Sequence, residues 1–375
     1  MLNPSFATDS ELFVGAISGT SADGVDVALV RFSGPRCELL GSLTQVYPAA
    51  VHAHVLQLSQ GDPQTTLDAL GELDVAVAEA FGDAILTLLD RLSVEPSKIA
   101  AIGSHGQTLR HRPLGNYPFT LQIGDPNRIA ERCGITVVAD FRRRDVAAGG
   151  HGAPLVPAFH ARMFGSNNES RAILNIGGIA NLSLLPGHGQ TRGFDTGPGN
   201  GLMDAWIKRC TGANYDMNGE FASNGRIDQA LLHTLREDAY FFFFFSKSSG
   251  RDHFHLPWLE RHIGGRELSA ADVQATLCAL TIHTIVDALR LSQPDTKRIL
   301  VCGGGVHNRH LMQGLCAALP HICVESTADH GVDPDAIEAM TFAWLARETL
   351  AGRPGNLREV TGARGPRILG GIYPA

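Results

Sequence analysis

The feature that most constrains the fold is one order of predicted elements that occurs twice along the chain. Each half reads as strand, glycine turn, strand, strand, helix, strand, helix, strand, without evident sequence identity between the halves. The glycine turns, at residues 18–24 and 177–178, follow the first strand of each half. Two tight hairpins before the first helix differ from the strict alternation of a dinucleotide-binding domain. The pattern predicts a duplicated α/β protein, with a ligand cleft between two lobes.

Hydrophobic periodicity places the elements of each half. In the first half we expect strands at residues 12–17, 25–32, 37–47, 99–104 and 135–139, and a helix at 66–95. In the second half we expect strands at 172–176, 182–185, 191–195, 299–302 and 322–325, and helices at 200–210, 271–292, 308–318 and 335–350. The expected lobes are residues 1–140 and 141–355, with residues 356–375 able to return to the first lobe.

Composition and charge exclude several classes of protein. The chain has 375 residues, of which 44% are hydrophobic, so it is long and apolar enough to form two cores. Its formal net charge of −7 argues against nucleic acid or an anionic membrane as a partner. No apolar run approaches about 18 residues, so no membrane span is expected. Seven scattered cysteines without a CxxC pair, and an N-terminus without signal-peptide character, favour the reducing cytoplasm.

The first glycine turn is a candidate phosphate site. Its small residues let backbone N–H groups approach an anion closely, and its hydroxyls add donors. The carboxylates of Asp23 and Asp26 would add oxygen ligands for Mg²⁺. A hairpin turn without any ligand is an equal alternative. The candidate residues are Gly19, Thr20, Ser21, Ala22, Asp23, Gly24, Val25 and Asp26.

Two further glycine segments lie in the second half. Gly177 and Gly178 form the corresponding turn, and the two turns together would clamp a polyphosphate. Gly303, Gly304 and Gly305 end a buried strand before Asn308, which can cap the next helix. A plain strand-to-helix turn would need only one glycine. The chain contains no GxxxxGK[ST] motif, which excludes a Walker P-loop, and no GxGxxG motif that opens a helix after a strand, which disfavours NAD(P).

Asp195 is the candidate general base. It stands at the expected end of a strand, before a Gly-Pro-Gly turn, so its carboxylate would project into open space. The alternative is a structural turn residue.

Polar residues at other strand ends suit a hydroxyl-rich ligand such as a sugar. The candidate substrate-binding residues are His105, Gln107, Thr108, Gln122, Gly124, Asp125, Gly197, Pro198 and Asn200. The arginines at 142–144 could bind a carboxylate bidentately, or form a solvated charge run.

Seven motifs, in this order, closely resemble the anhydro-N-acetylmuramic acid kinase family from Leu12 to the C-terminus. They are SGTSADGVD, SHGQT, QIGDP, DFRRRDVAAGGHGAPL, NIGGIANL, GFDTGPGN and CGGGVHN. The resemblance implies two duplicated RNase H-like lobes of the actin, hexokinase and sugar-kinase superfamily around a central cleft. It implies ATP, Mg²⁺ and a 1,6-anhydro amino sugar from peptidoglycan recycling, phosphorylated at O6 as water opens the anhydro ring. The phenylalanine run at 241–245 departs from the family pattern.

The resemblance also implies roles for particular residues. Asp195 would take a proton from the water that attacks the anomeric carbon, and the freed O6 would attack the γ-phosphoryl group. Glu338 is a candidate helper, or else an ordinary helix-surface glutamate. The glycines at 303–305 would lie near the nucleoside, and the lactyl carboxylate of the substrate would need an arginine or backbone donors. An ordinary sugar kinase and a non-catalytic actin-like nucleotide-binding protein are the alternatives, and the sequence leaves a homodimer open.

Overall fold

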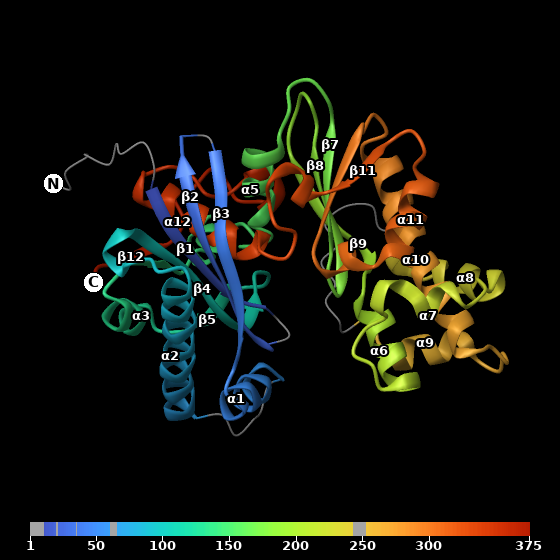
Figure 1. Cartoon of the computed structure of the whole chain (residues 1–375), viewed down its shortest axis with the longest axis horizontal. Helices are drawn as coiled ribbons and strands as arrows, with labels where there is room; N and C mark the ends of the chain where they lie inside the picture. Colours follow the sequence, from blue (N-terminus) through green and yellow to red (C-terminus); the bar gives the residue numbers. More distant parts are fainter. Residues whose placement is uncertain (1–10, 20–21, 35, 61–65, 243–252) are drawn as a thin grey trace. The chain divides into compact units, whose positions relative to one another are not determined.

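The computed structural model describes residues 11–19, 22–34, 36–60, 66–242 and 253–375. The chain divides into two compact units (Figure 1). Unit 1 comprises Met1–Phe159 and Ala336–Ala375, and unit 2 comprises His160–Asp335. Each unit is built around one β-sheet.

The sheet of unit 1 has the path β12-β6-β4-β1-β2-β3, with β5 added beside β4. Its strands are β1 (Glu11–Ser18), β2 (Gly24–Ser33), β3 (Arg36–Val46), β4 (Ile99–Arg112), β5 (Phe119–Ile123), β6 (Val137–Ala139) and β12 (Gly371–Tyr373). The first three strands are antiparallel, whereas β4 is parallel to β1, and β6 is parallel to β4. The carboxyl ends of β1 and β6 therefore lie on either side of the middle of β4, opposite Gln107 and Ser104, and the first glycine turn lies there.

Helices cover this sheet and connect its strands. They are α1 (Ala49–Gln60), α2 (Leu67–Arg91), α3 (Pro126–Cys133), α4 (Arg143–Ala147), α12 (Ile337–Leu350) and α13 (Arg358–Thr361), with α5 (Val156–Phe164) at the boundary of the units. The side chain of Thr66 caps α2 by accepting a hydrogen bond from Ala69 N. Val77 and Phe81 of α2 are buried in one core with Val27 and Leu29 of β2. In Figure 1 the C-terminal strand β12 lies beside α3.

Helix α12 packs on β1 and β4 at backbone distance. A Cβ atom at Gly15 would overlap the carbonyl oxygen of Ala339, and one at Gly103 would overlap that of Phe342. Small residues on both sides thus let the helix backbone rest on the strands. This contact assigns α12 to unit 1, so the expected lobe boundaries at 140/141 and 355/356 differ from the observed ones at 159/160 and 335/336.

Unit 2 repeats the topology of unit 1. Its strands are β7 (Arg171–Ile176), β8 (Ile179–Leu185), β9 (Arg192–Pro198), β10 (Arg298–Cys302) and β11 (Cys323–Ser326). The order β11-β10-β7-β8-β9 corresponds to β6-β4-β1-β2-β3 of unit 1, with the same antiparallel start and parallel continuation. The predicted fold class, an α/β protein with two duplicated RNase H-like lobes, is confirmed.

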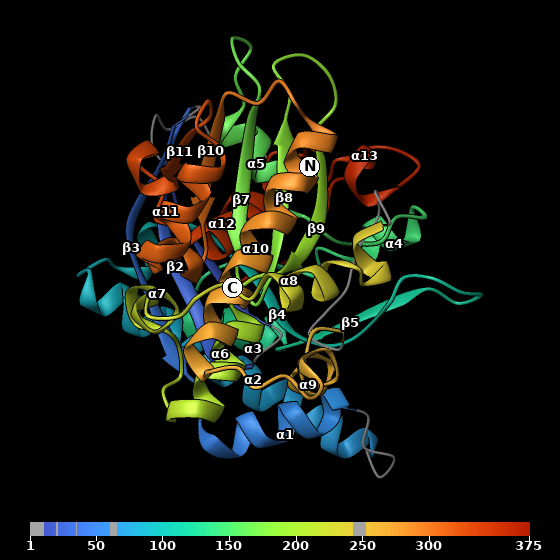
Figure 2. The same cartoon turned by 90° about the vertical axis from the view of Figure 1, so that its right-hand side faces the viewer.

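The helices of unit 2 lie between β9 and β11 in the chain. They are α6 (Gly201–Thr211), α7 (Glu220–Ser223), α8 (Gln229–Arg236), α9 (Leu256–Ile263), α10 (Ala270–Ser292) and α11 (Arg309–Ala318). Figure 2 shows α10 lying across β8 and β9, which it contacts. Among the described residues, α10 alone is long and apolar enough, by length and composition only, to cross a membrane. Its apolar window is 61% buried in the unit, as is typical of a core helix.

Two strands run further than periodicity predicts. The expected strand at 99–104 continues to Arg112, where its second half pairs with β5. The expected strand at 191–195 continues to Pro198, so Asp195 lies inside β9 and not at its end. Because β9 is an edge strand, a proline at its last position removes no hydrogen bond from the sheet interior.

We predict that Gly103→Ala destabilises unit 1, because the new methyl group would displace α12 from β4. Overpacking of this kind typically costs about 1–3 kcal/mol of unfolding free energy. Gly71→Ala is the matched control. Gly71 is an exposed residue of α2, and no atom lies within 4 Å of the position that a Cβ would occupy. The control should be neutral or stabilise by about 0.5–1 kcal/mol. Urea denaturation measures both, and equal midpoints would contradict the close packing of α12.

Candidate active site

The first glycine turn joins β1 to β2 in unit 1. Thr20 and Ser21 lie outside the described residues. Ala22 is buried with a left-handed φ of 56°, and its N–H donates to Gly19 O at 3.1 Å. Gly24 lies so close to β3 that a Cβ would overlap Gln45 O. The turn is therefore closely packed. Such packing fixes the backbone groups that a turn can present to a ligand.

The two carboxylates of this turn have different environments. Asp23 is exposed, whereas Asp26 is half-buried in β2 and accepts a hydrogen bond from Thr44 Oγ1 at 2.6 Å. Among the described residues no group of three or more potential metal ligands occurs. Mg²⁺ commonly binds one or two carboxylates and keeps several waters, so these two side chains fit such a site in kind and number.

Gln107 of β4 connects the turn to the rest of the edge. Its Nε2 donates to Gly19 O at 3.2 Å, across the parallel pairing that places Ser18 opposite Gln107. Within the described part of the chain, Gln107 Oε1 and Ser104 Oγ are buried without a hydrogen-bond partner. Buried polar atoms are rarely left unsatisfied, so this edge has hydrogen-bonding capacity for a ligand or for ordered water.

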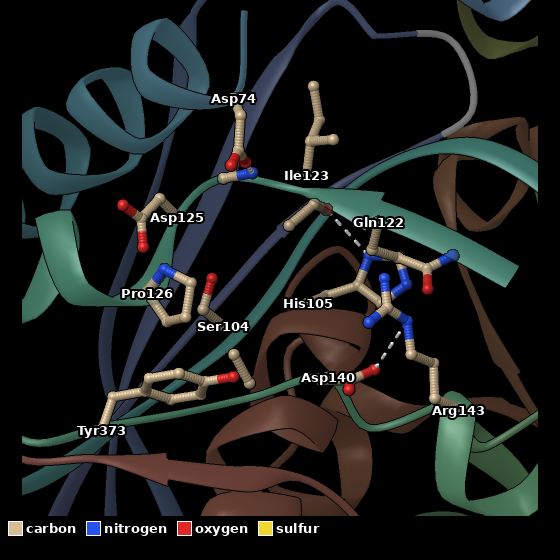
Figure 3. Close-up of a pocket in the computed structure, with 13 residues that line it drawn as sticks. Asp74, Ser104, His105, Gln122, Ile123, Asp125, Pro126, Asp140, Arg143 and Tyr373 are labelled. Atoms are coloured by element: carbon tan, nitrogen blue, oxygen red, sulfur yellow. Dashed lines mark hydrogen bonds and ion pairs between the residues drawn. The ribbon is translucent and has the colours of Figure 1, made fainter. Parts of the chain in front are cut away.

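Four of the predicted substrate-binding residues line one cavity of about 170 Å³ in unit 1 (Figure 3). They are His105, Gln122, Gly124 and Asp125. Thr108 is adjacent, since its Oγ1 accepts from Gln122 Nε2 at 3.0 Å. The remaining lining residues are Asp74, Ser104, Gly106, Ile123, Pro126, Ala139, Asp140, Arg143 and Tyr373. The structure thus brings polar residues from the middle of β4 and from the ends of β5 and β6 around one cavity.

His105 has a partner on each ring nitrogen. Its Nδ1 lies 2.9 Å from Gly106 O and therefore carries the proton, while Nε2 accepts from Arg142 Nε at 2.8 Å. Burial, and then the charge of Arg142, hold the pKa of His105 well below its usual range. The imidazole is neutral, and it positions Arg142 beside the cavity.

Arg142 joins a small network of charges within unit 1. Burial lowers its pKa to about 10, while Glu338 and Asp145 favour its charged form. The pKa of Glu338 is raised, first by desolvation and then by Asp26, and Arg142 opposes that shift. As a residue Glu338 is exposed at the start of α12, although the groups around its carboxyl desolvate it. Glu338 thus lies in unit 1, where it interacts electrostatically with the first glycine turn, whereas Asp195 lies in unit 2; its role as a helper stays a prediction.

Asp145 holds the loop that follows these arginines. It is fully buried and accepts hydrogen bonds from Gly152 N (2.8 Å), Asn356 Nδ2 (2.6 Å) and Thr361 Oγ1 (2.8 Å). Three donors for one carboxylate satisfy a charge that would be costly to bury alone. The C-terminal segment is thereby fastened to the arginine-rich loop.

In unit 2, the second glycine turn joins β7 to β8. Its carbonyl groups accept hydrogen bonds from residues at the start of α6. Asn200 N donates to Gly177 O at 2.7 Å, and Gly199 N and Gly201 N donate to Gly178 O at 3.0 and 3.1 Å. Asn200 Nδ2 donates to Ile176 O at 3.0 Å. The second glycine turn and Asn200, which the sequence predicts as separate candidate sites, are therefore joined by hydrogen bonds. A Cβ at Gly177 would meet nothing closer than 3.7 Å.

The three glycines after β10 lie against this turn, but they differ in whether the surrounding atoms leave room for a side chain. Gly303 has a φ of +75°, and a Cβ there would overlap Asn175 Oδ1. A Cβ at Gly305 would overlap the side chain of Ile176. Gly304 is exposed, and a Cβ there would lie 3.7 Å from Asn200 Nδ2. Packing thus explains Gly303 and Gly305, and leaves Gly304 as the glycine that faces outward.

Asp195 occupies a half-buried position in β9, opposite Asn181 of β8. The ladder shifts register directly after this pair, so Thr196 bulges and its Oγ1 donates to Ala180 O at 3.1 Å. Bulges recur next to active sites, where they re-aim a side chain. Gly197 and Pro198 are buried beside α10, where Thr281 Oγ1 donates to Pro198 O. Their expected contact with substrate stays a prediction.

The phenylalanine run lies mostly outside the described residues. Phe241 stacks on Phe254 with ring centroids 5.7 Å apart, and a Cβ at Gly197 would meet its ring. The start of the run is thus part of the packing beside β9.

The duplicated topology with a glycine turn at each hairpin defines the class of the protein, a two-lobed member of the actin, hexokinase and sugar-kinase superfamily. The family model for anhydro-N-acetylmuramic acid kinase matches residues 11–375, and the chain belongs to this family. It is 54% identical over 371 residues to the protein of that name from Xanthomonas campestris pv. campestris (strain 8004), covering 98% of each chain. It is 46% identical over 365 residues to the protein of the same name from Coxiella burnetii (strain Dugway 5J108-111), covering 97% of each.

Solved structures resemble the chain more weakly. A ROK family glucokinase from Streptomyces griseus in complex with glucose and AMPPNP aligns with a TM-score of 0.42 at 14% identity. The alignment covers 90% of this chain and 99% of that chain. A score at this level carries no argument, and the fold class rests on the two sheets themselves.

Several cavity residues were not predicted as site residues from the sequence. Asp74 comes from α2, and its Oδ1 accepts from Gly124 N at 2.6 Å. Asp140 has a left-handed φ of 61°, a conformation that non-glycine residues adopt rarely and often at functional sites. Tyr373 arrives from β12. The pairing of β12 with β6 is a long-range contact, so no local sequence signal indicates that Tyr373 lies here.

We predict that His105 makes unfolding easier as the pH falls below about 6.5. The unfolded state then binds a proton that the folded state refuses, so the unfolding free energy decreases with falling pH. The contribution is at most about 1.4 kcal/mol per pH unit. Urea denaturation between pH 7 and pH 5 should show a shallower pH dependence for His105→Gln than for the wild type. Parallel curves would contradict a neutral, buried His105.

Proposed function

We propose that this chain is an ATP-dependent kinase that opens 1,6-anhydro-N-acetylmuramic acid with water and phosphorylates O6. The products would be N-acetylmuramic acid 6-phosphate and ADP, in the recycling of peptidoglycan. Membership of the family supports this activity. Seven cysteines without a disulfide in the described part of the chain agree with the cytoplasm as its compartment.

The observation that carries the hydrolytic half is the placement of Asp195 on β9 beside a bulge. In the anhydro sugar, O6 has no proton, because it is bonded to C1. A general base must therefore act on water and not on O6. In the proposed reaction Asp195 takes the water proton, the water oxygen bonds to C1, and the C1–O6 electron pair departs onto O6. O6 then bonds to the γ-phosphorus, and the bond from phosphorus to ADP breaks.

The glycine turns would hold the nucleotide. Backbone groups of the turns at Gly19 and Gly177 would face the phosphates, and the outward-facing Gly304 would lie near the nucleoside. Asp23 and Asp26 are the side chains that would hold Mg²⁺, which neutralises phosphate charge when bound. The unsatisfied Gln107 Oε1 beside the turn agrees with a polar ligand at this edge.

We predict that Asp195→Asn binds ATP and the anhydro sugar but turns over about 10²- to 10⁴-fold more slowly, the usual cost of losing a general base. Calorimetry measures binding, and product formation measures turnover. Asp287→Asn is the control, because Asp287 is an exposed carboxylate of unit 2 that pairs with Arg236; it should keep full activity.

Labelled water separates the proposed reaction from an ordinary sugar kinase. Wild-type product made in ¹⁸O-water should carry the label at C1 when it is analysed before anomeric exchange. Phosphorylated product without label at C1, or an Asp195→Asn enzyme with most of its activity, would remove the hydrolytic half of the proposal and leave a kinase.

We predict that Gly177→Val weakens binding of Mg-ATP and leaves the melting temperature unchanged. The fold has room for the side chain, since nothing lies within 3.7 Å of its Cβ, but the new methyl groups would occupy the space in front of the turn. Gly265→Val, at an exposed position of unit 2 with open space around it, is the control and should bind normally. Unchanged affinity of Gly177→Val by calorimetry would count against a phosphate site at this turn.

A further inference from the structure

Arg143 is the one cationic side chain among the residues described as lining the cavity of unit 1. The structure separates the three consecutive arginines of this segment by environment. Arg142 is engaged with His105 and with Gly152 O. Arg144 is exposed and does not line the cavity. Only Arg143 of the three therefore combines access to the cavity with access to solvent, since 57% of its side chain is exposed.

The guanidinium group of Arg143 is held at one end only. Its Nε lies 3.4 Å from Thr120 O and 3.7 Å from Asp140 Oδ1, longer than the roughly 2.7–2.9 Å of a strong charge-assisted hydrogen bond. Its two terminal nitrogens donate to no described residue, so the fork that binds a carboxylate bidentately is available.

The rest of the cavity has the opposite character. Asp74 and Asp125 lie on the side away from Arg143 in Figure 3. Each already has a structural contact, Asp74 with Gly124 N and Asp125 as the N-cap of α3, and each keeps acceptor oxygens. Ser104 Oγ is buried there without a partner in the described residues. The cavity thus offers acceptors for hydroxyl or amide N–H groups at one end and a cation at the other.

We propose that Arg143 binds the lactyl carboxylate of the substrate and sets the preference for a muramyl sugar over the corresponding anhydro-glucosamine sugar. This inference rests on the proposed function and names the residue that recognises its substrate class. Asp140, close to the guanidinium group but not tightly bonded to it, keeps Arg143 oriented toward the cavity. The substrate then supplies the bidentate partner that Arg143 lacks.

The test compares kcat/KM for 1,6-anhydro-N-acetylmuramic acid with that for 1,6-anhydro-N-acetylglucosamine, which lacks the lactyl group. Wild-type enzyme should prefer the first sugar. Arg143→Ala should lose about 10- to 100-fold on the first sugar, as expected for a charged hydrogen-bonded pair, and little on the second. Arg143→Lys should recover part of the loss, because it restores the charge but not the fork. Arg144→Ala is the matched control and should keep the wild-type preference, with melting temperatures confirming that all variants fold.

The outcomes separate the two proposals. A wild-type enzyme that phosphorylates neither sugar would overturn the proposed function and this inference with it. An active wild type without a preference, or an Arg143→Ala enzyme that keeps the preference or loses activity equally on both sugars, would overturn the role of Arg143 alone. A loss of preference in Arg144→Ala as large as that in Arg143→Ala would do the same, since the effect would then be one of general charge.

Discussion

Parallel pairing of the central strands is the constraint on which the rest of each unit depends. Because β4 is parallel to β1 and β10 is parallel to β7, the carboxyl end of β1 lies beside the middle of β4, and the carboxyl ends of β7 and β10 meet. Segments far apart in sequence therefore converge there. In unit 1 these are the first glycine turn and the Ser104–Thr108 strand, and in unit 2 the second turn and the glycines after β10. Ligands of open α/β sheets bind at such edges, so topology alone selects where chemistry can occur.

The arginine-rich motif of unit 1 combines residues with structural contacts and a residue that lines the cavity. Asp145 is buried to fasten two loops, and His105 is buried as a neutral acceptor that orients Arg142. Breaking a buried charged contact leaves its partner unsatisfied, which costs more than the contact contributed. A motif of this kind must be intact as a unit, even though only part of it faces the cavity. Arg142 is half-buried and Arg143 is exposed, although the two are adjacent at the start of α4.

The sequence predicts most of the strands and the helices α2, α6, α10, α11 and α12, because their hydrophobic periodicity is local. It does not predict the other described helices, among them α1, α3, α5, α8 and α9. It misplaces the boundary of the lobes, since the position of α12 depends on the absence of side chains at Gly15 and Gly103, two residues distant from the helix in sequence. It ends the strand before Gly197 too early, because glycine and proline usually mark a turn, whereas a bulge at an edge strand accommodates both. Among the site residues, the motifs identify the segments that line the cavity, but not Asp74 or Tyr373, which long-range packing brings there.

The duplication also places a cross-strand pair of polar residues at the same position of each sheet, close to each glycine turn. Asp26 is the third residue of β2 and pairs with Thr44 across the ladder, while Asn181 is the third residue of β8 and pairs with Asp195. The carboxylate thus stands on the second strand in unit 1 and on the third strand in unit 2, with a neutral polar residue opposite it in both. All four residues are accessible enough to meet water. In the proposed reaction these two positions would have different functions, Asp26 as a ligand for a cation near phosphate in unit 1 and Asp195 as a base for water in unit 2.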